Sequence, residues 1–291
     1  MKCLIKIEGL VKKYQHKNAK NKDEWKTVVN NLNLHIKQGE IFGLLGPNGA
    51  GKTTTIRMLT MLTQATAGEI VYNGLNVKHD QEAMKALIGV VPQQINFDQD
   101  LTVGENMELH ARLHHMGKES RKQRIAELLE YVELSDRVND NVRLLSGGMK
   151  RRLLIARALI HNPKILFLDE PTVALDPQVR RRIWDLIRRM HREDVTVLLT
   201  THYIEEAENL CNRVAILNKG KLIALDTPKA LCERVGRYVV EWDTLEERDF
   251  RFFMTREAAA EFAATVDAAT TIRRSNLEDV FVELTGRKVN V

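Results

Sequence analysis

Cysteine is scarce in this sequence, and its placement suggests no structural role. The 291 residues include three cysteines, Cys3, Cys211 and Cys232. An odd number does not fit a framework of paired disulfides, and their spacing matches no metal-binding motif. We therefore expect free thiols in a reducing compartment.

Long apolar runs are also missing. The longest, ILFL and VTVLL, have the length of a strand, far below the roughly 20 residues that span a bilayer. The stretch MKCLIKIEGL has no long apolar core, so we expect no secretory signal peptide. Any role at a membrane would then require a partner protein.

A strong charge imbalance is absent as well. The net charge is +5 and the isoelectric point about 9.0. This mild excess suits a polyanionic partner or an anionic membrane surface, but many soluble proteins share it. Apolar residues make up 44% and charged residues 29%, which is typical of a globular chain that buries a core. The length suits one large domain or about two.

Alternating strand and helix patterns predict an α/β fold. Apolar strand-like segments occur at 4–10, 32–36, 40–46, 87–93, 164–171 and 195–202, with helical patterns between several of them. This order favours a core with parallel sheet, to which the early hairpins add an antiparallel layer. The polar stretch 15–26 is interpreted as a surface loop or the tip of an extended hairpin.

Residues 101–134 are predicted to be helical, with Thr102 and Ser120 as caps and Gly117 between two helices. The arginine-rich helix at 179–194 is expected to be a solvated face, with nucleic-acid binding as the less favoured interpretation. After about Asp226 the pattern changes to a small α+β appendage.

The segment GPNGAGKTT matches G-x-x-x-x-G-K-[ST] between a strand and a helix. Its glycines let backbone N–H groups converge on phosphate oxygens, and the helix dipole adds to the attraction. Lys52 would reach the β- and γ-phosphates, and the hydroxyl of Thr53 would bind Mg²⁺. The predicted nucleotide-binding residues are Gly46, Pro47, Asn48, Gly49, Ala50, Gly51, Lys52, Thr53 and Thr54. A P-loop NTPase core follows from this motif and its setting.

Polar residues end three further strands. Asp169 could hold Mg²⁺ through water, and Glu170 could orient and polarise the attacking water. His202 ends another strand, where ligands bind in open α/β sheets. Gln93 could sense the metal or the water, and Gln94 is an alternative.

The segment LSGGMKRRLLIARALI places a second Gly-rich helix start at Ser146, Gly147 and Gly148. It suits an anion, and the nearby cations Lys150, Arg151 and Arg152 are either attracted to that anion or solvated. The chain has two phosphate cradles but only one candidate catalytic base. This suggests that each nucleotide binds between the first cradle of one chain and the second cradle of another.

The phosphate loop, PQ, LSGG, FLDEP, ALD and TTH, in this order, resemble the ATP-binding subunit of an ABC transporter. The resemblance covers about residues 3–225. The segments GPNGAGKTTT, LSGGMKRRL and NLEDVFVELTG resemble the exporter branch that includes bacterial daunorubicin-resistance and nodulation systems. The resemblance implies an ABC-type ATP-binding domain at 1–225, with a helical subdomain at about 95–160, and an accessory domain at 226–291.

The resemblance also implies residue roles. Thr53, Gln93 and Asp169 would bind Mg²⁺. The catalytic residues would be Glu170, His202 and Gln93. Ser146, Gly147 and Gly148 would bind the γ-phosphate of the partner's ATP, and Asp176 would lie at the dimer seam. Tyr14 would stack on adenine, although Trp25 could take that place. Met149 stands where many members have glutamine, and Val173 where a small polar residue is common.

The implied function is that of an ATP-hydrolysing motor that couples ATP·Mg²⁺ to export through a separate transmembrane permease. The chain would pair with itself or with a related ATPase subunit, at the cytoplasmic face of the inner or plasma membrane and without nucleic acid. The alternative is a non-transport ABC ATPase acting on the ribosome or nucleic acid. Such proteins usually carry two cassettes or a long insertion, and neither is visible here.

Overall fold

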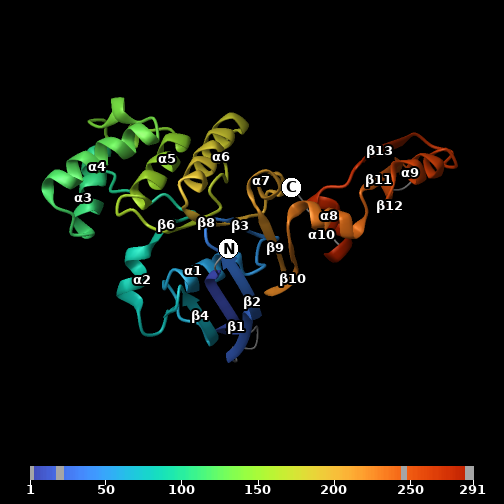
Figure 1. The fold of residues 1–291 in the computed structure, drawn as a ribbon, viewed down its shortest axis with the longest axis horizontal. Helices are drawn as coiled ribbons and strands as arrows, with labels where there is room; N and C mark the ends of the chain where they lie inside the picture. Colours follow the sequence, from blue (N-terminus) through green and yellow to red (C-terminus); the bar gives the residue numbers. More distant parts are fainter. Residues whose placement is uncertain (1–2, 18–22, 244–247, 286–291) are drawn as a thin grey trace.

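The structure is a computed structural model, and it describes residues 3–17, 23–243 and 248–285. Figure 1 shows helices α3, α4 and α5 together at one end and the C-terminal sheet with helix α9 at the opposite end. Strands β1, β2 and β4 lie below the central sheet in the same view. No helix in the described ranges is long and apolar enough to cross a bilayer.

The central sheet has six strands in the order β10-β9-β3-β8-β7-β6. Only the β9–β10 pair is antiparallel. Strands β3, β7 and β8 are buried throughout, as expected for parallel strands covered on both faces. Their carboxyl ends meet at one edge, where ligands bind in such sheets. The strands are β3 Ile41–Leu45, β6 Ile88–Val91, β7 Ile165–Asp169, β8 Thr196–Thr201, β9 Arg213–Asn218 and β10 Lys221–Asp226.

A second, antiparallel sheet has the order β2-β1-β4-β5. It comprises β1 Cys3–Lys17, β2 Asp23–Lys37, β4 Ala67–Tyr72 and β5 Leu75–Asn76. Alternate residues such as Ile5, Ile7 and Leu34 are fully buried and share a core with Phe42 and Leu44 of β3. The pairing of β1 with β2 continues to Lys17↔Asp23, so the described residues of the polar stretch, 15–17 and 23–26, belong to paired strands.

The helical segment consists of α3 Val103–Leu113, α4 Lys118–Tyr131 and α5 Gly147–Ala158. Thr102 caps α3 in a capping box with Glu105, as predicted. The prediction that Ser120 caps the next helix is wrong. Helix α4 begins at Lys118 with Gly117 as N-cap, so Ser120 already lies in its first turn.

The remaining helices of the nucleotide-binding part are α1 Lys52–Leu59, α2 Gln81–Leu87, α6 Pro177–Arg192 and α7 Ile204–Leu210. Helix α6 is amphipathic: Ile183, Leu186, Ile187 and Met190 are buried, while most of its arginines are exposed. The solvated face expected for this helix is therefore present, although some of its arginines also line a pocket.

The C-terminal part contains a three-stranded antiparallel sheet, β12-β11-β13, with α9 packed on it. Leu277, Val280 and Phe281 of the last helix share a core with Leu231, and Leu277 N–H donates to Glu208 Oε1 at 2.6 Å. The predicted α/β fold with an antiparallel layer and an α+β appendage is confirmed, whereas the domain division at 225 stays a prediction. The elements are α8 Pro228–Val235, β11 Tyr238–Asp243, β12 Arg248–Phe253, α9 Arg256–Ala263, β13 Thr270–Arg274 and α10 Leu277–Thr285.

Candidate nucleotide site

The phosphate loop connects β3 to α1 and needs glycine at two tight positions. A Cβ at Gly46 would lie 2.3 Å from the carbonyl oxygen of Leu217. Gly51 has a φ of 99°, and a Cβ there would lie 2.8 Å from Val28 O. A larger residue at either position would therefore push the loop away from its neighbours or strain the loop backbone.

The β9–β10 turn holds the loop from outside. Gly220 N–H donates to Ala50 O at 3.1 Å, and Asn30 N–H donates to Gly220 O at 2.8 Å. The antiparallel layer and the turn at Lys219–Gly220 thus fix the curvature of the loop.

Lys52 is buried beneath the loop. Its ammonium donates to the carbonyl oxygens of Gly46 and Pro47 at 2.7 and 3.2 Å. Its Nζ lies 3.7 Å from Glu170 Oε1. Burial lowers the pKa of Lys52, and the nearby carboxylates of Glu170 and Asp169 oppose that shift. A cation held in this way is ready to receive an anionic ligand.

Asp169 ends β7 and joins two threonines. Its Oδ1 accepts hydrogen bonds from the hydroxyl of Thr53 at 3.1 Å and from that of Thr200 at 2.6 Å. Asp169 as a whole is only 6% exposed. The structure therefore brings two of the predicted metal-binding residues, Thr53 and Asp169, into direct contact.

Glu170 is held in a left-handed backbone conformation with a φ of 48°. Its N–H is directed at Thr200, lying 3.1 Å from the carbonyl oxygen and 3.0 Å from the hydroxyl. A non-glycine residue in this region is uncommon and is retained where the surroundings over-determine it. The conformation turns the side chain toward Lys52 rather than along the strand.

The Glu170 carboxylate gathers the other predicted catalytic side chains. Gln93 Nε2 donates to Oε2 at 3.3 Å, and His202 Nδ1 lies 3.2 Å from the same oxygen. The His202 contact is close enough for an ion pair, but its angles are not those of a hydrogen bond. Glu170 itself is 7% exposed. Six predicted residues thus form one cluster: Lys52, Thr53, Gln93, Asp169, Glu170 and His202.

The second predicted cradle is an N-cap. The Ser146 hydroxyl accepts from Met149 N–H at 3.3 Å at the start of α5. Gly148 is buried, and a Cβ there would lie 2.4 Å from Val179 Cγ1, so close packing against α6 also requires this glycine. Ser146 and Gly147 are exposed. Among the described residues, no hydrogen bond or ion pair joins 146–148 to the phosphate loop of the same chain.

All three cations after this cradle contact the chain's own carbonyls, and Lys150 Nζ donates to Arg143 O at 3.5 Å. Arg151 is buried and donates to Pro92 O and Gln93 O at 2.7 and 2.9 Å. Arg152 donates to Val132 O at 2.6 Å. Backbone carbonyls occupy both Nη atoms of Arg151, so the expectation that it faces an incoming anion is wrong for that residue, whereas Arg152 uses only Nη1 for its carbonyl contact.

Comparisons with known proteins agree with this geometry. The model of the ABC transporter family matches residues 29–173. A protein of Cupriavidus metallidurans described as Nod factor export ATP-binding protein I is 42% identical over 283 residues, covering 90% of this chain and 93% of that protein. The chain belongs to the ABC transporter ATP-binding family. Membership makes it an ATP-binding protein and an ATP hydrolase, and it confirms the predicted P-loop core.

Further relatives of this ABC ATPase include one curated protein and two solved structures. A protein of Ralstonia nicotianae with the same description is 36% identical over 313 residues, covering 98% of this chain and 95% of that protein. A solved dimeric ATP-binding cassette bound to ADP and phosphate is 32% identical, with a TM-score of 0.69, covering 77% of this chain and 98% of that one. The solved structure of an ATP-binding subunit of an ABC transporter has a TM-score of 0.71 at 23% identity, covering 97% of this chain and 99% of that one, and it shows the fold.

Three other predicted residues of the ABC ATPase, Tyr14, its alternative Trp25, and Asp176, have no contact with the cluster among the described residues. Tyr14 is 39% exposed on β1, with the Lys12 ammonium 4.7 Å from the centre of its ring. Trp25 lies opposite Gln15 on the hairpin and is 65% exposed. Asp176 caps α6, its carboxylate accepting from Gln178 N–H and Val179 N–H at 3.1 and 2.9 Å. The roles of Tyr14 at adenine and of Asp176 at a dimer seam stay predictions.

Sequence reasoning missed a buried network behind the cluster. Glu206 of α7 is fully buried and accepts from the Thr172 hydroxyl at 2.8 Å and from Trp184 Nε1 at 3.1 Å. Burial raises the pKa of Glu206, and the hydrogen bonds partly offset that effect. Thr200, which supports both Asp169 and Glu170, was also missed. The only sequence signal was that Thr200 is the first residue of TTH and that Thr172 follows DEP, and threonine is too common in strands for that signal to be specific.

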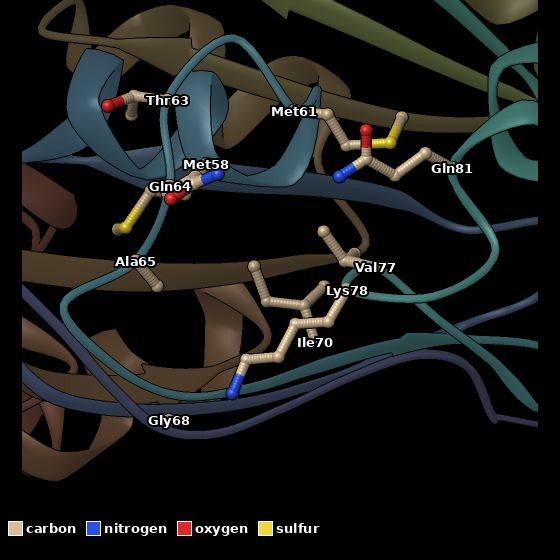
Figure 2. Close-up of a pocket in the computed structure, with 10 residues that line it drawn as sticks. All are labelled: Met58, Met61, Thr63, Gln64, Ala65, Gly68, Ile70, Val77, Lys78 and Gln81. Atoms are coloured by element: carbon tan, nitrogen blue, oxygen red, sulfur yellow. The ribbon is translucent and has the colours of Figure 1, made fainter.

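A cavity of about 250 Å³ in the ABC ATPase lies outside this cluster. Figure 2 shows that its lining comes from the end of α1, the loop after it, β4 and the segment before α2. Met58, Met61, Ile70 and Val77 make it largely apolar. None of the predicted nucleotide-binding residues lines it, so it is no part of the ATP site.

Proposed function

We propose that the chain is the motor subunit of an exporter and that two copies, or one copy and a related subunit, close head-to-tail around two ATP molecules. The observation that carries this proposal is a site divided between two places. Lys52, Glu170 and His202 form one cluster, whereas the exposed cradle at Ser146 has no contact with it in the same chain. A second chain would supply the missing cradle.

In this proposal the phosphate loop and Lys52 bind the β- and γ-phosphates. Thr53, Asp169 and Gln93 would hold Mg²⁺, which neutralises phosphate charge when bound. The fit rests on the contact between the Thr53 hydroxyl and Asp169, since oxygen ligands suit this ion. Ser146, Gly147 and Gly148 receive the γ-phosphate bound by the partner chain.

Glu170 is proposed as the general base or water-orienting carboxylate. Its carboxylate is removed from bulk water and lies within reach of Gln93 and His202, which orient it. A base must lie within hydrogen-bond reach of the proton it accepts. The position of Glu170 beside Lys52 at the phosphate loop supports this role, since a water at the γ-phosphate would lie near the same carboxylate. His202 links the γ-phosphate to this base.

The motion passes to a separate transmembrane permease in this proposal. The expected contact is the 92–97 loop and the helices at 102–134, where Ile95, Leu109 and Leu113 expose large apolar side chains. Leu109 and Leu113 lie one helical turn apart on the same face of α3. Export is favoured by the description of the relatives as export ATP-binding proteins. The ATPase would then lie at the cytoplasmic face of the membrane, bound through the permease.

The substitution Glu170→Gln tests the shared site. It keeps the size of the side chain and removes the base, so the variant should bind ATP, hydrolyse it at least about a hundredfold more slowly and accumulate as a dimer. Size-exclusion chromatography with light scattering measures the dimer with and without ATP. Glu205→Gln on the exposed face of α7 is the matched control. A Glu170→Gln protein that binds ATP but stays monomeric at saturating ATP contradicts the shared site.

A further inference from the structure

A pocket of about 250 Å³ lies between the end of α4, helix α5 and helix α6. It collects basic side chains from elements far apart in the sequence: Arg152 of α5 and Arg182, Arg189 and Arg192 of α6. Tyr131, Glu133 and Asp185 also line it. None of these residues belongs to the nucleotide cluster.

The charges in this pocket are not balanced. Arg152 pairs with Glu133 at 3.0 Å, and Arg189 pairs with Glu193 at 3.5 Å. The Asp185 carboxylate pairs with Arg188, which does not line the pocket. The side chains of Arg182 and Arg192 have no ion pair or hydrogen bond with any described residue. Two cations in the pocket therefore lack a carboxylate.

Gathering these arginines has an electrostatic cost. Burial lowers the pKa of Arg152, Glu133 opposes that shift and the like charge of Arg182 adds to it. The side chain of Arg152 is only 12% exposed, so water screens this repulsion poorly. An anion placed between the guanidinium groups would relieve it.

Two of the four arginines are held in place. Arg152 Nη1 donates to Val132 O at 2.6 Å, which anchors its guanidinium at the wall. The Arg189 guanidinium lies 3.9 Å from the centre of the Tyr131 ring, as in a cation–π contact. Because these groups are already ordered, a ligand would bind with a smaller entropic cost.

We propose that this pocket binds a compact anion that carries a phosphate group. Planar guanidinium groups pair with phosphate oxygens in bidentate fashion, and four of them around one small volume suit a phosphate better than a single carboxylate. The confined pocket fits a phosphorylated small molecule or a lipid phosphate headgroup rather than an extended polymer. The arginines of α6 that sequence analysis treated as a solvated face thus include a binding site.

Calorimetric titration of pyrophosphate into protein saturated with ADP tests the proposal, because ADP occupies the phosphate loop. One saturable site is expected. The double substitution Arg182→Ala/Arg192→Ala should weaken it by at least about tenfold, the scale of losing one charge-assisted contact. Arg181→Ala is the matched control, since Arg181 is exposed on the same helix and does not line the pocket.

The same proteins distinguish the source of the phosphate. A lipid headgroup would be assigned if the protein sediments with vesicles of phosphatidic acid in phosphatidylcholine but does not bind pyrophosphate. Only the double variant should then lose the sedimentation. Pyrophosphate binding lost only in the double variant supports a soluble ligand. If neither probe binds, if Arg181→Ala weakens binding equally, or if only a duplex oligonucleotide binds, the proposal is overturned. Thermal unfolding of each variant shows that the fold is intact.

Discussion

Glu170 is the central residue of the cluster, because its left-handed backbone directs a buried carboxylate at Lys52. Thr200 stabilises that conformation by accepting the Glu170 N–H and by donating to the adjacent Asp169. A single threonine therefore positions both acids. Strain of this kind persists at functional sites where neighbours compensate it.

Lys52→Ala should abolish most ATP hydrolysis. The substitution removes the cation bound beneath the loop and leaves the carbonyl oxygens of Gly46 and Pro47 without their donor. Loss of one such charge stabiliser typically costs about 10²–10³ in rate. Phosphate release from ATP measures it, with Lys150→Ala as control. Full activity in Lys52→Ala would remove the phosphate loop from the mechanism.

Glu206→Gln should stabilise the protein at alkaline pH. Burial raises the Glu206 pKa in the folded chain above its unfolded value. The folded chain then binds the proton more tightly, so the free energy of unfolding falls as pH rises through the folded pKa. Glutamine keeps an oxygen for Thr172 and Trp184 and has no proton to lose.

Thermal unfolding of wild type and Glu206→Gln at pH 5 and pH 8 measures this difference. The variant should gain in melting temperature at pH 8 relative to wild type, and the gain should shrink at pH 5. An equal difference at both pH values would show that Glu206 titrates alike in the folded and unfolded chains.

Two buried arginines of helix α5 bind the 92–97 loop and connect it to the helix. Arg151 binds the carbonyls of Pro92 and Gln93, while Arg157 binds Asn96 and lies over the Phe97 ring at 4.8 Å. Burial lowers the pKa of Arg157 to about 10, so it stays charged at neutral pH. The helix that begins at Ser146 is thereby connected to the loop that carries Gln93.

Arg151→Gln should slow ATP hydrolysis while ATP binding persists. Glutamine cannot bind both carbonyls in the planar fork of arginine, so Gln93 loses its support beside Glu170. Misplacing a catalytic group in this way costs about 10- to 100-fold in kcat. Steady-state kinetics and nucleotide titration separate the two effects. Lys150→Gln on the same helix is the control, and an unchanged kcat in Arg151→Gln would refute the coupling.

The molecule as a whole presents three separate surfaces: the exposed cradle at Ser146, the apolar side chains near Leu109, and the basic pocket of α5 and α6. In our proposals the first binds a second chain, the second a permease and the third a phosphate. They are made of different residues, so substitutions can test them separately.

Leu109→Asp/Leu113→Asp should release the permease while leaving basal ATP hydrolysis unchanged. Both side chains are exposed, 42% and 64%, so the fold loses little when they become charged. Co-purification of a membrane protein from detergent extracts measures the interaction. Met254→Asp is the control, an exposed apolar residue in the C-terminal part. Retention of the membrane protein by the leucine variant would contradict this docking surface.

The sequence by itself determined the fold and the residues of the nucleotide cluster. Each motif is local: a glycine loop between a strand and a helix, or a polar residue at the end of an apolar strand. Because parallel strands end at the same edge, such local motifs converge in space without further information. Lys52, Asp169, Glu170 and His202 meet for that reason.

Only the tertiary structure decided what lies behind and beside that cluster. Thr200 and Glu206 act through partners distant in sequence, and their residue types carry no specific pattern. The arginines after the cradle differ in partner although they are adjacent: Arg151 binds the Gln93 loop, and Arg152 lines the basic pocket. A charge in a sequence has no partner until the chain folds, because the carbonyls and carboxylates that bind it come from other elements.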